Sequence, residues 1–204
     1  MTDSSFRLPR LQLSALAILI SSLSFIVLAL PVEAHHPIGD LSPKDYNIWQ
    51  GIISGLTHPI FGVDHLIFLM SIGLTGLASI HRWVVPLIGC TIAGSLAGLI
   101  SPPLLMQEAW VGLSLIALAV VALRNFPPVW VLPLITVHGY ILAGTMVGAK
   151  IIPLAGYLCG LALSELVIII GGFLLVRRFQ PQLSLLAGII TGFGLSVAGA
   201  AVLS

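Results

Sequence analysis

Charged residues are scarce in this chain. Its 204 residues include eight Lys and Arg and seven Asp and Glu, so that 7% are charged, whereas a soluble domain carries roughly 25%. So few charges neither solvate a globular surface nor form a basic stripe for nucleic acid, and both classes are excluded. The 58% of hydrophobic residues indicate instead that most of the surface faces a lipid bilayer.

Paired cysteines and several enzyme motifs are also missing. Cys90 and Cys159 both lie inside apolar runs, which is typical of packing residues and excludes a disulfide framework or a paired metal signature. No Gly-x-x-x-x-Gly-Lys-Ser/Thr sequence occurs, which excludes a nucleotide-driven pump. His-Glu-x-x-His and Gly-x-Ser-x-Gly are absent too, so we expect that the protein is not an enzyme.

The first 34 residues have the pattern of a targeting segment. Arg7 and Arg10 precede an uncharged stretch over 11–30, and small residues end the segment at Ala34, so we predict a signal peptide over 1–34 that is cleaved after Ala34. An uncleaved anchor is the alternative, because about 20 apolar residues also span a bilayer. Residues 35–50 then form a short outward-facing segment, and residues 51–204 form the membrane domain.

Six further apolar runs follow, each near the roughly 20 residues that cross the hydrocarbon core as a helix. They cover residues 51–76, 83–104, 108–124, 129–149, 153–176 and 183–203. Helix is predicted because lipid offers no partner to an unpaired backbone amide, and because runs of this length exceed the strands of a barrel. The predicted fold is all-α: a polytopic membrane helix bundle with six transmembrane helices after the signal peptide, or seven if the signal is retained.

The basic residues predict the orientation of this bundle. Connectors on one side contain Arg82, Arg124, Arg177 and Arg178, whereas the other side has Lys44 and Lys150. An excess of basic residues marks the cytoplasmic side. We therefore expect a multi-pass protein of the cell (inner) membrane, with the mature N-terminus and the C-terminus outside.

Small residues and the division of the runs suggest how the helices pack. Glycines at four- and five-residue spacing, such as Gly89, Gly94 and Gly98, predict faces on which helix backbones approach closely. Three runs precede Arg124 and three follow it, which is the pattern of an inverted repeat. The pattern assigns no oligomeric state.

Three titratable residues lie near the middle of separate runs: Asp64 in the first, His138 in the fourth and Glu165 in the fifth. A charge at this depth costs about 2.5 to 3.5 kcal/mol on insertion scales, so an intramembrane ionisable residue indicates a functional site. Residues that faced lipid by accident would scatter in depth. Their common depth predicts a polar site between helices.

The densest group of such residues is the segment His58-Pro59-Ile60-Phe61-Gly62-Val63-Asp64-His65. On an unbroken helix His58 and His65 would be about 10.5 Å apart along the axis, but Pro59 and Gly62 predict a local kink. Imidazole and carboxylate are ligands for divalent first-row ions. Asp64 either ligates the ion or orients a histidine; the alternative is that these side chains only hydrogen-bond neighbouring helices.

The remaining candidates carry open alternatives. His138 is either an ion ligand or a satisfied interior histidine, and Glu165 is a proton-coupling carboxylate, an ion ligand or a partner of His138. His35 and His36 would form a flexible outward chelator that loads a cation after cleavage, or else an ordinary terminus. His81 adjoins a basic connector residue and is expected to be solvated.

The motif His58-Pro59-x-x-Gly62-x-Asp64-His65, at the start of a six-helix protein behind a signal peptide, resembles the HupE/UreJ family of nickel/cobalt permeases. His138-Gly139 is similar to the family's later His-Gly feature, and the Ala34-His35 junction also matches. One departure is Leu142, where many members have a further histidine.

The resemblance implies a carrier or facilitator for a divalent nickel or cobalt ion, with no tightly bound cofactor. The alternatives are an intramembrane metal-dependent hydrolase and a non-transporting membrane assembly or haem-binding protein. The predicted metal ligands are His58, Asp64, His65, His138, Glu165, His36 and His35.

Overall fold

The computed structural model describes residues 42–75, 80–179 and 182–203. All secondary structure assigned in these ranges is helical. The predicted all-α class is therefore confirmed for this part of the chain. The main helices are α2 (Ile48–Phe61), α3 (Val63–Ser71), α4 (Ile80–Ile100), α5 (Gln107–Leu123), α6 (Val131–Leu142), α7 (Ile151–Phe179) and α8 (Leu183–Leu203). Short 3-10 turns are η1 (Pro43–Asp45), η2 (Ile72–Leu74), η3 (Pro128–Trp130) and η4 (Ala143–Met146). The predicted signal peptide lies outside the described residues.

Four helical segments are long and apolar enough to cross a membrane, namely Ile80–Ile100, Pro128–Met146, Ile151–Phe179 and Leu183–Val202. The consecutive helices Ile48–Phe61 and Val63–Leu74 form a fifth as a pair bent by 77°. The third predicted run contains α5, which has 17 residues and extends only about 25 Å. It begins at Gln107, one residue before the predicted run, and follows Pro102, Pro103 and the left-handed backbone of Met106, with φ 55°. The structure thus supports four or five spans, and the count of six stays a prediction.

Local hydrogen bonds determine where the first of these helices begins. The Asn47 side chain accepts from the Gln50 backbone N–H at 3.0 Å, and the Gln50 side chain accepts from the Asn47 N–H at 2.8 Å. Such a reciprocal capping box satisfies two amides that a helix start leaves without partners. It holds the beginning of α2 where the chain enters the bundle.

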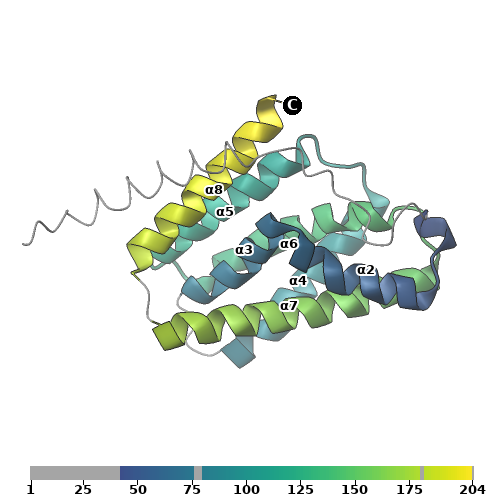
Figure 1. Cartoon of the computed structure of the whole chain (residues 1–204), viewed down its shortest axis with the longest axis horizontal. Coiled ribbons are helices and arrows are strands. Elements are labelled where there is room, and N and C mark those ends of the chain that lie inside the picture. Colours follow the sequence, from purple (N-terminus) through teal and green to yellow (C-terminus); the bar gives the residue numbers. More distant parts are fainter. Residues whose placement is uncertain (1–41, 76–79, 180–181, 204) are drawn as a thin grey trace, which may run out of the picture.

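Two pairs of parallel helices form the centre of the molecule. In the first pair α2 lies along α7 (Figure 1), with Gly51 against Pro153 and Gly55 against Tyr157. In the second pair α4 packs against α6, with Gly94 against Thr136 and Gly98 against Tyr140. At these glycines an added methyl group would overlap backbone atoms of the partner helix. Close backbone approach through glycine therefore holds both pairs together.

A third pair, α5 and α8, lies side by side at the edge of the bundle (Figure 1). Gly112 and Gly194 face each other there, again with no room for a side chain. The predicted packing role is confirmed for Gly94 and Gly98 but is wrong for Gly89, whose Cβ position has no atom of a neighbouring helix within 4 Å. Gly89 is exposed on α4.

The polar side chains gather inside the bundle. His65, His138 and Glu165 are all buried, with Glu165 only 1% exposed. Large apolar side chains face outward instead, including Val85, Ile100, Val167 and Leu174. This distribution inverts the usual arrangement of a soluble domain and fits a protein whose solvent is lipid.

Candidate metal centre

The first predicted site segment lies at a break between two helices. Pro59 has no N–H to donate to the Gly55 carbonyl four residues earlier. Ser164 Oγ of α7 lies 3.3 Å from that carbonyl oxygen, and its shorter contact is to the Leu161 carbonyl at 2.9 Å. The helix ends at Phe61, Gly62 has an extended backbone with φ −74° and ψ 95°, and α3 begins at the next residue. The predicted kink is therefore confirmed, as a bend of 77°.

Gly62 is required at the break for space rather than for backbone freedom. Its φ and ψ are accessible to any residue, but a Cβ atom there would lie 3.2 Å from His65 Nδ1 and 3.3 Å from Asp64 Oδ1. It would also lie 3.2 Å from the carbonyl oxygen of His58. A side chain at position 62 would therefore press on the polar groups of the candidate site.

Asp64 orients His65. Asp64 Oδ1 lies 2.8 Å from Nδ1 of the His65 ring. Because a carboxylate only accepts, the ring hydrogen is on Nδ1, and in the neutral imidazole Nε2 then has the free lone pair. Nε2 of His65 is buried and has no hydrogen-bond partner. This arrangement is typical of a histidine that a carboxylate prepares for a metal ion.

The break also brings three histidine rings together. The ring centres of His58 and His65 are 5.6 Å apart, and those of His65 and His138 are 5.3 Å apart, in edge-to-face geometry. These rings come from α2, α3 and α6. We call them the histidine cluster. It joins residues of the first and second helix pairs at the centre of the bundle.

Two residues that sequence reasoning missed hold His138. Ser114 Oγ of α5 lies 3.2 Å from His138 Nδ1, and the Phe68 ring stacks on the imidazole with centres 3.7 Å apart and planes 14° apart. Nε2 of His138 is buried without a hydrogen-bond partner, as in His65. Ser and Phe are ordinary residues of apolar helices, so the sequence offers no signal for either role.

Glu165 is a buried residue of α7 that is 1% exposed. One carboxyl oxygen, Oε2, is buried and has no hydrogen-bond partner. The role of Glu165 in an ion site stays a prediction.

The remaining predicted site residues have different surroundings. His35 and His36 lie outside the described residues, and His81 is exposed at the start of α4. Within 42–75, 80–179 and 182–203, no three His, Cys, Asp or Glu side chains are arranged so that they hold a metal ion as they stand. The histidine cluster is therefore a gathering of candidate ligands and not a closed coordination shell.

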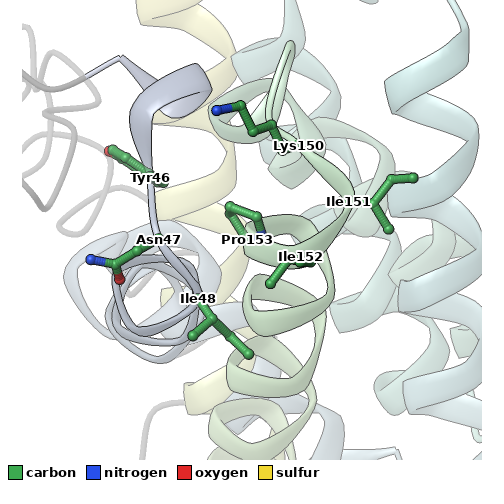
Figure 2. A pocket seen from close by; sticks show the side chains of 7 residues that line it. All are labelled: Tyr46, Asn47, Ile48, Lys150, Ile151, Ile152 and Pro153. Atoms are coloured by element: carbon green, nitrogen blue, oxygen red, sulfur yellow. The ribbon is translucent and has the colours of Figure 1, made fainter.

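A hollow lies away from the histidine cluster, where α2 and α7 begin (Figure 2). It has a volume of about 770 Å³ and is lined by residues 46–48 and 150–153. Figure 2 labels Lys150 at its rim, and the rest of the lining includes the apolar side chains of Ile48, Ile151 and Ile152. Because it combines a positive charge with isoleucines and contains no acidic or imidazole group, this hollow does not suit a metal cation.

The fold and the cluster define a polytopic helical membrane protein with buried imidazoles between its helices. The model of the HupE / UreJ protein family matches residues 23–202. The chain belongs to this family, which confirms the resemblance seen in the motifs. It is a transporter-type membrane family, linked to nickel/cobalt transport or to urease and hydrogenase maturation. No curated protein and no solved structure matches the chain.

Proposed function

We propose that this protein carries a divalent nickel or cobalt ion across the membrane, as a secondary carrier or facilitator. The ion is its cargo, held in passing by the histidine cluster, while Asp64 orients His65. The observation that carries the proposal is that Nε2 of His65 and Nε2 of His138 are both buried without a hydrogen-bond partner. A polar atom in that state costs free energy, which a ligand recovers.

The spacing of the rings suits a shared ion. A metal-to-nitrogen bond is about 2.1 Å long, and the centre of the imidazole ring lies about 1.1 Å beyond the nitrogen. Two imidazoles whose bonds to one ion make an angle of about 110° therefore have ring centres about 5.2 Å apart. The two ring pairs measure 5.3 and 5.6 Å. We propose that the side chains close around the arriving ion by small rotations. A site that forms only around its cargo also lets the ion leave, as conduction requires.

The chemistry of the ligands favours a transition metal. Imidazole nitrogen suits nickel, cobalt, copper and zinc, whereas magnesium and calcium prefer oxygen ligands. The carboxylate that contacts the cluster is that of Asp64, and a low count of anionic ligands would keep binding reversible. In the proposed orientation the ion leaves toward the side with the arginine connectors, and both mature termini are outside.

Uptake of radioactive nickel and cobalt by proteoliposomes tests the proposal. We expect Asp64→Asn to lower uptake by about 10-fold, because it weakens the support of a ligand. His65→Ala removes a ligand and lowers uptake further. His81→Ala is the matched control, since His81 is exposed and outside the cluster, and it keeps the wild-type rate. Equal uptake by all four proteins refutes the site, and no uptake by any of them refutes the transport function.

A further inference from the structure

Ser114 of α5 contacts His138 of the histidine cluster but is not one of the proposed ion ligands. The residue is buried, and its hydroxyl makes two contacts: to the Val111 carbonyl at 2.6 Å and to His138 Nδ1 at 3.2 Å. A serine hydroxyl has one hydrogen to donate and two lone pairs with which to accept. The roles of the two contacts therefore follow from which partner takes that hydrogen.

The Val111 carbonyl takes it, because a carbonyl oxygen only accepts and this contact is the shorter of the two. Ser114 Oγ is then an acceptor toward His138, and Nδ1 of the ring must carry a hydrogen. Nε2, on the other side of the ring, has no hydrogen-bond partner. The contact with Ser114 therefore selects the Nδ1–H tautomer.

The opposite tautomer is disfavoured on both sides of the ring. It would direct the lone pair of Nδ1 at the lone pairs of Ser114 and bury an Nε2–H group without an acceptor, and both are unfavourable. Phe68 meanwhile holds the plane of the ring by stacking, with planes 14° apart. Tautomer and plane of His138 are thus controlled by residues of two different helices.

We propose that Ser114 is a positioning residue that keeps His138 in its Nδ1–H tautomer, so that the Nε2 lone pair is available to the transported ion. The inference rests on the proposed function for the ion, but the tautomer itself does not. Ser114 does for His138 what Asp64 does for His65, with a neutral hydroxyl in place of a carboxylate. Nothing in the motif around His58 or around His138-Gly139 contains this residue.

Nitrogen-15 NMR of protein with labelled histidine rings tests the tautomer in micelles, with His138→Asn identifying the His138 signals. We expect a hydrogen on Nδ1 in the wild type, a mixture of tautomers in Ser114→Ala, and the wild-type state in Ser114→Thr. Nickel binding by equilibrium dialysis then shows a dissociation constant about 10-fold higher for Ser114→Ala, the low end of the range for such supporting residues. Ser114→Thr restores the affinity because it keeps the hydroxyl.

Ser196→Ala is the matched control. Ser196 is a buried serine of α8 whose hydroxyl donates to a carbonyl of its own helix at 3.0 Å, and we expect its loss to change nickel affinity less than about twofold. A hydrogen on Nε2 of wild-type His138 overturns the inference even if Ser114→Ala does not fold. Unchanged tautomer and affinity in a folded Ser114→Ala also overturn it. A wild-type protein that binds no nickel refutes the proposed function, while its NMR spectrum still decides the tautomer.

Discussion

The two parallel helix pairs use the same packing but differ in continuity. In each pair glycines let the backbones touch, and a serine hydroxyl of one helix lies near a glycine carbonyl of the other. Ser95 donates to the Gly139 carbonyl at 3.0 Å, and Ser164 Oγ lies 3.3 Å from the Gly55 carbonyl oxygen. The helix that contains His138 is continuous, whereas the helix that contains His58 breaks at Gly62. Glycine packing is thus common to both pairs, whereas the break at Gly62 brings the histidine rings together.

The likeness of the pairs also bears on the predicted inverted repeat. An inverted repeat equates the first span with the fourth and the second with the fifth. The contact of α2 with α7 then corresponds to that of α6 with α4, and both contacts are found. The third span, α5, corresponds to the sixth, α8, so the repeat maps this pair onto itself. The observed pairing is therefore the one that such a repeat requires, although the repeat itself stays a prediction.

The largest effect is expected from variants that disrupt the glycine contacts within both helix pairs. Gly160→Ala in α7 and Gly94→Ala in α4 each place a methyl group on backbone atoms of the partner helix, and backbone cannot rotate away. We expect each to lower the free energy of unfolding by about 3 kcal/mol or more. Thermal unfolding of the protein in detergent measures this loss.

Each helix supplies its own control. Gly171 in α7 and Gly89 in α4 have no atom of a neighbouring helix within 4 Å of the added methyl group. Alanine at these positions is expected to be neutral or to stabilise by about 0.5 to 1 kcal/mol, because glycine weakens a helix interior. If the control variants unfold as readily as Gly160→Ala and Gly94→Ala, glycine contacts do not hold the pairs together.

The next effect concerns the ion that is proposed to bridge the two pairs. His65→Gln and His138→Gln each remove one imidazole, and each is expected to raise the nickel dissociation constant roughly 100-fold, or about 2.7 kcal/mol. Because one shared ion needs both rings, the double variant should lose little more than either single one. Calorimetric titration of the four proteins gives the coupling. Losses that add fully would mean that His65 and His138 do not share one ion.

A smaller effect is expected at the break, where one variant distinguishes ion binding from the stability of the fold. Gly62→Ala fits the backbone at this position, but its methyl group would lie 3.2 Å from His65 Nδ1 and 3.3 Å from Asp64 Oδ1. We expect a change in the free energy of unfolding of about 1 kcal/mol or less and a nickel affinity about 10-fold lower, as for other losses of ligand support. Thermal unfolding and equilibrium dialysis on the same sample give both values. A large loss of stability with unchanged affinity would contradict this division.

Several features of the site were predictable because one chemical rule determines each of them. Runs of about 20 apolar residues locate helices because lipid requires internally bonded backbone. Pro59 and Gly62 predict a bend because one lacks an N–H and the other lacks a side chain. Asp64 beside His65 indicates an orienting carboxylate. Each of these inferences depends on residues that are close in the sequence.

Other features depend on how each helix is rotated about its own axis, which a run of apolar residues does not determine. Gly89 and Gly94 lie on the same predicted packing helix, yet only Gly94 meets a partner. Ser114 reaches His138 from a helix whose sequence shows no polar motif. A hydrophobic run predicts that a helix spans the bilayer, whereas small local contacts decide which face meets which neighbour.

The smallest effect is expected at Glu165, and it sharpens the comparison between the two carboxyl groups of the bundle. Asp64 contacts a ring of the histidine cluster at 2.8 Å, whereas Glu165 is buried on α7 and its Oε2 has no hydrogen-bond partner. Glu165→Gln keeps the size of the side chain and one carbonyl oxygen as an acceptor. We therefore expect the nickel dissociation constant to change less than about twofold, against about 10-fold for Asp64→Asn. If calorimetric titration instead gives equal losses for the two variants, Glu165 belongs to the same ligand set, and the ion site extends across both helix pairs to α7.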